Sequence, residues 1–252
     1  MISVVVNPSF QHLQEFARQI PERFDSDGTL LYRKRNVVKL YEIDGMRVVV
    51  KRYKVPMFHQ RVDYTFIRPS KAKRAYLFAL RLQEMGIETP TPIAYIEVKQ
   101  LGLFRQGYFL STYTTRHSLK ESIGQLHPGS PLFEAYVRFL VEMHDKGFLH
   151  GDQNLSNILW YEAADGIHFE VIDVNRSHFK ISPTKQECLD NLMRVTHDRR
   201  LSADVVSRYA ELRGWQKDEC VAYIHAAIEK YEKRHEFHKH FKRRKPNKGE
   251  GH

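Results

Sequence analysis

The stretch "LHGDQNLSNILW", Leu149–Trp160, decides how this sequence folds. It places His150 and Asp152 a few residues before Asn157, with apolar residues on both sides. A plain turn explains the pattern, because Asp, Asn and Gly are common turn residues. A catalytic loop explains it as well, with Asp152 as a base and Asn157 as a metal ligand at a fixed separation. His150 is then an organiser of the loop and not itself a base.

A second stretch, "FEVIDVNR" at Phe169–Arg176, adds a further candidate ligand. Here Asp173 follows an apolar strand and offers a carboxylate, while Asn157 offers a neutral amide oxygen. Mg²⁺ prefers a few oxygen ligands from the protein, together with phosphate and water. Asn157 and Asp173 are therefore the predicted Mg²⁺ ligands.

Composition excludes several classes of protein. The 252 residues are 42% hydrophobic and 28% charged, as in ordinary globular proteins, which argues against wholesale disorder. No apolar run approaches the roughly 18–20 residues that span a bilayer. The Val run near the N-terminus has no basic residues before it and is interpreted as a first strand, not a signal peptide. Cys188 and Cys220 show no metal or redox spacing, which fits a reducing cytoplasm.

The net charge of +10 and the pI near 9.5 fit nucleic acid, an anionic membrane surface or a phosphorylated ligand. Nucleic acid is not expected, because no recognised module or aromatic platform accompanies the charge. The basic tail at 236–252 has two interpretations, a solvated extension or a surface for anionic lipid. The histidines at its start, His235, His238 and His240, are interpreted as a solvated polar face and not as a metal site.

The first part of the chain predicts strands around a single helix. The Asp44-Gly45 dipeptide is a strong hairpin signal. Ser70 is a suitable N-cap, and Gly86 a suitable stop, for a helix with an apolar stripe between them. The expected strands, besides the N-terminal one, are 29–33, 37–43, 46–53, 93–98 and 107–113, and a basic linker separates the third of these from the helix.

The chain changes character after Tyr113. Pro131 opens a helix that Gly147 ends, a short strand pair lies around 157–160 and 168–172, and the rest is expected to be helical. These patterns predict an α+β fold of two lobes, an antiparallel-sheet N-lobe at 1–113 and a mainly helical C-lobe at 114–235, followed by the basic tail.

Lys51, on the third strand, completes a set of parts suited to phosphoryl transfer from ATP. That reaction needs a group to orient the acceptor hydroxyl, a metal across the phosphates, and a cation on the α- and β-phosphates. Asp152, the pair Asn157 and Asp173, and Lys51 match these needs. Each residue alone fits an ordinary turn or a solvent-facing lysine. Their order, a strand lysine, then H-x-D-x-x-x-x-N, then an aspartate after an apolar strand, is typical of protein-kinase-like enzymes.

The motifs "HGDQNLSNILW" and "VIDVNRSHF", with "VVVKRY" and "SKAKRAYLFALRLQEMGIETPTPIAYIE", resemble the bacterial lipopolysaccharide kinases of the Kdo/heptose kinase family. The resemblance runs from about Asn36 to Asp190. It implies a protein-kinase-like fold, ATP and Mg²⁺ as cofactors, and a hinge around Ser111–Tyr113. Backbone groups there, those of Thr112 included, would meet adenine.

Two departures from the kinase pattern stand out. No G-x-G-x-x-G precedes Lys51, and the first strand turn carries "RKRN", whose Arg35 would cover phosphates if it is not simply solvated. The helix glutamate that pairs with the lysine in kinases is replaced by Ala75, and Glu84 lies nine residues later. Lys51 is therefore expected to lack that partner, which questions the rate of catalysis but not the fold.

By this resemblance the chain is an ATP-dependent kinase of a sugar hydroxyl, Kdo or heptose, in the lipopolysaccharide core or a lipid A precursor. It would act in the cytoplasm, peripherally on the inner membrane. One alternative is a related kinase with a protein or small-molecule acceptor. The other is a nucleotide-binding pseudokinase scaffold, favoured by Ala75 and disfavoured by the intact Asp152, Asn157 and Asp173. The sequence does not identify the sugar, the hydroxyl or the oligomeric state.

Overall fold

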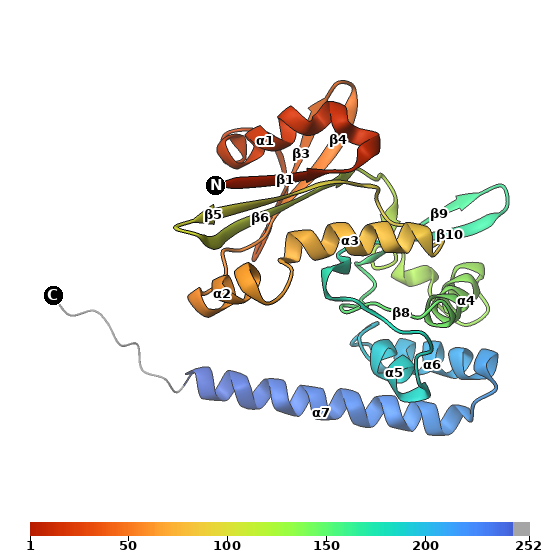
Figure 1. Ribbon diagram of the computed structural model, residues 1–252. Helices are drawn as coiled ribbons and strands as arrows, with labels where there is room; N and C mark the ends of the chain where they lie inside the picture. The colour runs from red at the N-terminus through yellow and green to blue at the C-terminus, as the bar shows by residue number, and fades with distance from the viewer. Residues whose placement is uncertain (244–252) are drawn as a thin grey trace. The chain divides into compact units, whose positions relative to one another are not determined.

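The computed structural model describes residues 1–243, the side chains of 235–243 excepted. Its chain packs into two compact units, traced in Figure 1. Unit 1 consists of Met1–Glu121, His150–Asp152 and Ser156–His178. Unit 2 consists of Ser122–Leu149, Gln153–Leu155 and the described residues from Phe179 onward. Asp152 and Asn157 thus fall in unit 1, while Gln153–Leu155 between them fall in unit 2. The predicted boundary at 113 assigns the whole loop to the second lobe, and the lobe boundaries stay a prediction.

Unit 1 is built on an antiparallel sheet, which confirms the predicted α+β class. Its strands follow the order β1-β5-β6-β4-β3-β2 across the sheet. The Asp44-Gly45 hairpin is confirmed, since φ is 51° at Asp44 and 75° at Gly45, as a tight two-residue turn requires. The strands are β1 (Ile2–Val6), β2 (Thr29–Arg33), β3 (Val37–Ile43), β4 (Met46–Arg52), β5 (Pro92–Gln100) and β6 (Leu103–Thr112).

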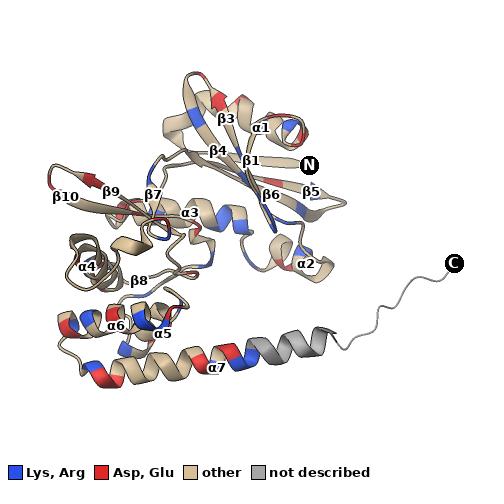
Figure 2. Cartoon of the chain, turned by 180° about the vertical axis from the view of Figure 1, so that it is seen from behind, with Lys and Arg blue, Asp and Glu red and all other residues tan. Residues whose placement is uncertain are grey.

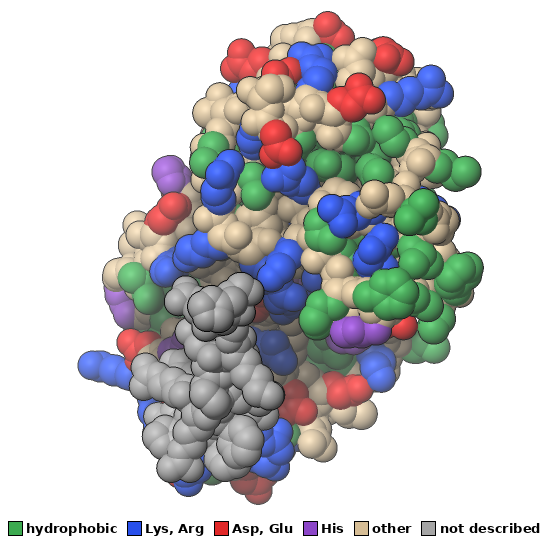
Figure 3. All heavy atoms as spheres, turned by 90° about the vertical axis from the view of Figure 1, so that its left-hand side faces the viewer, with side chains coloured by type: hydrophobic (Ala, Val, Ile, Leu, Met, Phe, Trp, Pro, Cys, Tyr) green, Lys and Arg blue, Asp and Glu red, His purple; other side chains and the backbone are tan. Residues whose placement is uncertain are grey.

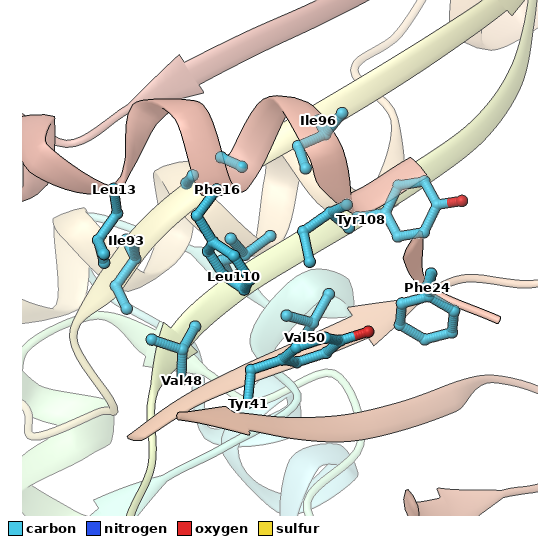
Figure 4. Packing of buried hydrophobic residues seen from close by; sticks show 13 residues of the cluster. Leu13, Phe16, Phe24, Tyr41, Val48, Val50, Ile93, Ile96, Tyr108 and Leu110 are labelled. Atoms are coloured by element: carbon cyan, nitrogen blue, oxygen red, sulfur yellow. The ribbon is translucent and has the colours of Figure 1, made fainter. Parts of the chain in front are cut away.

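One face of this sheet is covered by α1 (Gln14–Arg23), which follows a 3₁₀ turn, η1 (Pro8–Leu13). The sequence analysis did not predict this helix. Its Phe16 packs against Tyr41, with ring centroids 5.4 Å apart, in the hydrophobic cluster shown in Figure 4. Val48 and Val50 of β4 lie in the same cluster. Side chains alternate between the two faces of a strand. Lys51, the residue after Val50, therefore points to the face of the sheet opposite Val48 and Val50.

The opposite face carries α3 (Lys71–Glu84), the helix expected from the sequence. The predicted N-cap is confirmed, since the Lys73 N–H donates to Ser70 Oγ at 3.2 Å. Ala72 packs so closely on the sheet that a Cβ on Gly107 would lie 3.1 Å from its side chain. This close approach fixes the distance between α3 and the sheet, next to the strand that carries Lys51.

The predicted basic linker before α3 contains a helix, α2 (Phe58–Phe66). None of its residues is buried. Hydrophobic periodicity therefore gave no signal for it, because such a signal arises from a buried face.

The remaining part of unit 1 is a small sheet with strand order β10-β9-β7. It consists of β7 (His117–Ser118), β9 (Ile158–Ala163) and β10 (Gly166–Val171), and β9 and β10 confirm the predicted strand pair. A 3₁₀ turn, η3 (Val174–Arg176), follows and packs against α3.

Unit 2 is mainly helical in its described part. The helix predicted from Pro131 is α4 (Pro131–Asp145), capped by Ser130, and Gly147 follows it with φ of 78°. The other elements are η2 (Ile123–Gln125), β8 (Phe148–Leu149), β11 (His178–Phe179), α5 (Lys185–Leu192), α6 (Arg199–Arg213) and α7 (Lys217–Arg243). Over the described residues, no helix has both the length and the apolar composition that crossing a bilayer requires.

A polar network ties the helices of unit 2 together around His144 of α4. The hydroxyl of Tyr209 lies 2.7 Å from His144 Nδ1, and Asn191 Oδ1 lies 3.1 Å from Nε2. The Tyr209 hydroxyl accepts in turn from Arg213 Nε at 3.0 Å. Burial lowers the pKa of His144 to about 4, so the ring is neutral at physiological pH.

Candidate active site

The structure brings together the predicted phosphate lysine and one predicted metal ligand. Lys51 Nζ of β4 lies 2.7 Å from Asp173 Oδ1, which follows β10. The side chains remain 17% and 33% exposed, so a ligand can reach both groups. A cation and a carboxylate that lie far apart in the sequence of unit 1 thus form the centre of the candidate site.

Asp173 has an unusual backbone conformation. Its φ of 58° and ψ of 42° are left-handed, a region that residues other than glycine enter at a cost of about 1 kcal/mol or more. Asn175 holds the turn, since its Nδ2 donates to Asp173 Oδ1 at 2.5 Å and its side chain is buried. The sequence analysis missed this role of Asn175. Its spacing two residues after Asp173 in a turn was the available signal.

The charges around Asp173 keep its carboxylate ionised. Burial raises the pKa of this group, but the nearby charges of Lys51 and Arg176 lower it by more, so that the pKa lies below its usual 3.8. Asp173 therefore carries its negative charge throughout the physiological range, as a ligand for a divalent cation must.

His150 organises the loop, as predicted. It is fully buried, its Nδ1 accepts from the Asp152 N–H at 3.0 Å, and its Nε2 lies 2.9 Å from the Ile172 carbonyl oxygen. An accepting Nδ1 places the proton on Nε2, which then donates to Ile172. Burial lowers the pKa of His150, which favours this neutral form. The ring thus connects the backbone of Asp152 to the residue before Asp173.

Gly151, between His150 and Asp152, is required by close packing. A Cβ at this position would lie 2.0 Å from the Arg176 carbonyl oxygen. The Gly151 N–H also lies 3.4 Å from Ser177 Oγ, to which it donates. The loop therefore lies directly on the segment that follows Asp173, and a larger residue would separate the two.

Asp152 and Asn157 are held in the same loop. Asn157 Nδ2 donates to the Asp152 carbonyl oxygen at 2.8 Å, and the Asn157 carbonyl oxygen accepts from the Ile172 N–H at 3.0 Å. With its Nδ2 committed to the loop, the Asn157 side chain offers its amide oxygen to a ligand. An amide oxygen and the Asp173 carboxylate are hard oxygen donors, so the residues present fit Mg²⁺.

The structure supplies Lys51 with a carboxylate other than that of a helix glutamate. Ala75 of α3 is buried against Tyr53 and cannot provide one, and Glu84 is exposed at the end of the helix. The Lys51 ammonium instead pairs with Asp173 and lies 5.4 Å from the centre of the Tyr53 ring. The expectation that Lys51 lacks its helix glutamate is thus met, but the lysine has an anionic partner.

A group of cations missed by the sequence analysis lies beside Asp173. The pKa of Lys71, at the start of α3, falls to about 8 because of burial and of the nearby charges of Arg35, Arg176 and Arg74, while Asp173 raises it. These four cations come from the β2–β3 turn, α3 and η3. Arg35, predicted to cover phosphates, is one of these cations, which we call the cationic cluster (Arg35, Lys71, Arg74 and Arg176).

Thr112, predicted to meet adenine through its backbone, lies at the end of β6. Its N–H donates to the Thr91 carbonyl oxygen at 3.0 Å, and its hydroxyl accepts from the Thr91 N–H at 2.9 Å. The Tyr113 N–H donates to the Arg47 carbonyl oxygen at 3.1 Å. With both N–H groups committed to the sheet, a backbone contact to adenine from Thr112 would use its carbonyl oxygen.

Thr112 also lines a pocket of about 660 Å³ within unit 1. Arg116 lines this pocket too, with its Nη1 2.8 Å from Glu88 Oε2 and 3.3 Å from Glu170 Oε1. Burial raises the pKa of Glu170, although Thr114 and Arg116 oppose the shift. The pocket is distinct in its residues from the group around Lys51 and Asp173.

Comparison with known proteins gives a family and a fold for this chain. A family model described as the lipopolysaccharide kinase (Kdo/WaaP) family matches residues 22–212. A search of curated proteins finds no match.

Among solved structures, WaaP in complex with acyl carrier protein is similar, with a TM-score of 0.61 and 19% identity. The similarity covers 90% of this chain and 98% of that one. At this level of identity the likeness concerns the fold, and it confirms the predicted kinase-like fold.

Proposed function

Because the chain belongs to the Kdo/WaaP lipopolysaccharide kinase family and is therefore a kinase, we propose that its acceptor is a sugar hydroxyl, Kdo or heptose, of the lipopolysaccharide inner core. ATP use follows from kinase activity, and Mg²⁺ is the metal that the donor set favours. The observation that carries this proposal is the ion pair of Lys51 with Asp173, 2.7 Å long. The residue before Asp173 is hydrogen-bonded to the loop that holds Asp152 and Asn157, since the Ile172 N–H donates to the Asn157 carbonyl oxygen.

Each residue has a role in the proposed transfer. Lys51 binds the α- and β-phosphates of ATP, while Asn157 and Asp173 would hold Mg²⁺, which neutralises charge on the phosphates. Asp152 accepts a hydrogen bond from the sugar hydroxyl and orients it toward the γ-phosphorus. The hydroxyl oxygen forms a bond to phosphorus as the bond to the β-phosphate oxygen breaks. ADP leaves, and the hydroxyl proton passes to Asp152 and then to solvent.

The cationic cluster supports an acidic acceptor. It places Lys71 and Arg176 beside Asp173, where a reacting sugar would approach. A sugar acid such as Kdo carries a carboxylate, and a positive site favours such a group over a neutral sugar. We therefore propose Kdo attached to a lipid A precursor ahead of heptose.

The proposed place of reaction is the cytoplasmic face of the inner membrane, where the protein would associate peripherally. The predicted contact of the basic tail with anionic lipid concerns residues 236–252, whose side chains lie outside the described residues, as do those of His235, His238 and His240. This contact therefore stays a proposal based on the sequence alone.

The test is mass spectrometry of Kdo-bearing lipid A after incubation with Mg²⁺ and ATP. Wild type should add one phosphate, and Asp152→Asn should add none in the same time. Asp165→Asn is the matched control, since Asp165 is an exposed carboxylate in the β9–β10 turn that pairs with His168. Phosphorylation by Asp152→Asn at the wild-type rate would refute the assignment of the base.

A nucleotide-binding scaffold is the second candidate, and the observation that favours it is Ala75 in place of a helix glutamate. It predicts Mg²⁺-dependent stabilisation by ATP in a thermal-shift assay with no transfer to any acceptor. Transfer to another acceptor, including the protein itself, would instead identify a related kinase with a different substrate.

A further inference from the structure

One side of the helix α2 is fixed to β6. Arg61 Nε donates to the Phe104 carbonyl oxygen at 2.8 Å, and the Phe104 N–H donates to Thr65 Oγ1 at 2.9 Å. The rings of Tyr64 and Phe104 meet edge to face, with centroids 5.4 Å apart. Arg61, Tyr64 and Thr65 are spaced as one face of a helix, so that this face is anchored to β6.

The two ends of α2 present large apolar side chains to solvent. Met57 and Phe58, at its start, are 64% and 67% exposed, while Phe66 and Ile67, at its end, are 74% and 76% exposed. Single exposed apolar residues are ordinary, but a group of four on one short element marks an interaction surface. We call these four residues the α2 patch.

Positive charge surrounds the α2 patch. The segment 54–74 contains six Lys or Arg residues and one Asp, which gives a formal charge of +5. Lys54 and Arg68, next to the patch, are exposed. Figure 2 shows Lys and Arg at the end of α3 that adjoins α2, and Figure 3 shows hydrophobic and basic side chains side by side on the face that carries α2.

We propose that α2 inserts the α2 patch into the surface of an anionic lipid bilayer. Apolar side chains that protrude between cations match the boundary between acyl chains and charged headgroups. The aliphatic stems of Lys and Arg lie along such a boundary while their charges reach the phosphates. The four side chains are largely exposed and therefore do not form the floor of a groove, which favours a deformable lipid surface over a protein with a complementary ridge.

This interaction goes beyond the proposed reaction, since it needs neither nucleotide nor acceptor. It also differs from the predicted role of the basic tail, because it depends on residues 57–67 and includes an apolar component. A test of membrane binding can therefore succeed or fail whatever the sugar acceptor proves to be.

Sedimentation of the full chain with vesicles tests the proposal. Phosphatidylcholine vesicles that contain phosphatidylglycerol should bind wild type, and pure phosphatidylcholine should bind it much less. Phe66→Ser combined with Ile67→Ser should weaken binding about tenfold or more, because two inserted side chains are lost. Ile181→Ser is the matched control, since Ile181 is fully exposed in the loop before α5, and it should bind like wild type.

A second measurement reports insertion directly. Phe66→Cys can be labelled selectively with an environment-sensitive dye, because the native thiols Cys188 and Cys220 are buried. The dye should shift to the blue with anionic vesicles and be quenched by brominated acyl chains. Unchanged emission, or a double variant that sediments like wild type, would overturn the proposal. Binding of an acidic protein by wild type, in the absence of any vesicle binding, would also overturn it and would assign the α2 patch to a protein partner.

Discussion

Two buried histidines show how the same type of side chain serves two purposes. His144 in unit 2 and His150 in unit 1 are 1% and 0% exposed, and burial lowers the pKa of each. Both use their two ring nitrogens in hydrogen bonds. The difference lies in what these bonds hold.

The partners of His144 are side chains of α5 and α6, so its hydrogen bonds join helices. The partners of His150 are backbone groups of Asp152 and Ile172, so its hydrogen bonds set the positions of a proposed base and of the residue before a proposed metal ligand. The two histidines thus teach that burial and a shifted pKa do not distinguish structure from function. The hydrogen-bond partners of each histidine distinguish the two roles.

The largest expected effect is on kcat, from a change to the Asp152 carboxylate that leaves the hydrogen bonds of His150 in place. Asp152→Asn should lower kcat by about 10³-fold, because a positioned general base contributes roughly 10²–10⁴. The loop itself should keep its conformation, since Asp152 is held through its backbone N–H and carbonyl. Steady-state kinetics and thermal melting together check this; a large fall in Tm would show that the carboxylate is structural.

The next effect concerns pH and the network of His144. Because the pKa of His144 is about 4 when folded and 6.5 when unfolded, the unfolded state binds the proton first. Stability should therefore fall as the pH drops from 6.5 toward 4, by at most roughly 3 kcal/mol from this group.

Urea unfolding checks the His144 prediction, followed by Trp215 fluorescence in a Trp160→Phe background. Trp215 is a suitable reporter because its ring lies 5.7 Å from that of Tyr209. His144→Gln should be less stable at neutral pH but should lack this part of the pH dependence. An equal slope in both proteins would contradict the assignment.

The counterpart in unit 1 is His150→Ala, which should act on catalysis first. It removes the acceptor of the Asp152 N–H and the donor to Ile172, so the loop loses its fixed geometry. Misplacement of about 1 Å costs roughly 10²-fold in rate. The fall should appear in kcat, and His150→Gln should restore part of it because an amide can both accept and donate. An effect on Tm alone would make His150 equivalent to His144.

The smallest expected effect is that of Lys71 in the cationic cluster. Its pKa of about 8 means that it is charged below this pH and neutral above it. The KM for an anionic acceptor should rise about two- to fivefold as the pH passes through this value, as expected for one partly exposed charge. Lys71→Gln should raise KM at neutral pH and remove this pH dependence, whereas Lys73→Gln, two residues along α3, should not.

Local patterns in the sequence predicted a large part of unit 1. Alternation and turn residues predicted β3 and β4, and Ser70 predicted the start of α3, because each of these features depends on neighbours in the chain. The order of Lys51, Asp152, Asn157 and Asp173 predicted that they would meet, and the structure places Lys51 against Asp173.

What the sequence did not reveal depends on contacts between distant segments. The residues of the cationic cluster, such as Arg35, Lys71 and Arg176, come from different elements that lie far apart in the sequence. No spacing along the chain could therefore indicate the cluster. The helix α2 has no buried face and therefore no hydrophobic period. The kinase pattern places the partner of Lys51 on the helix that is α3 here. The ion pair is instead with Asp173, whose left-handed turn brings the carboxylate back toward β4.

The ion pair of Lys51 and Asp173 has a thermodynamic consequence for the ligands. In the free protein each of these groups neutralises the other at 2.7 Å, so a lone anion or a lone cation must compete with a partner already in place. ATP and Mg²⁺ arriving together satisfy both groups at once. Linkage then requires that each ligand raise the affinity for the other by the same factor. The protein should therefore bind the metal–nucleotide complex as a unit and discriminate against either component alone.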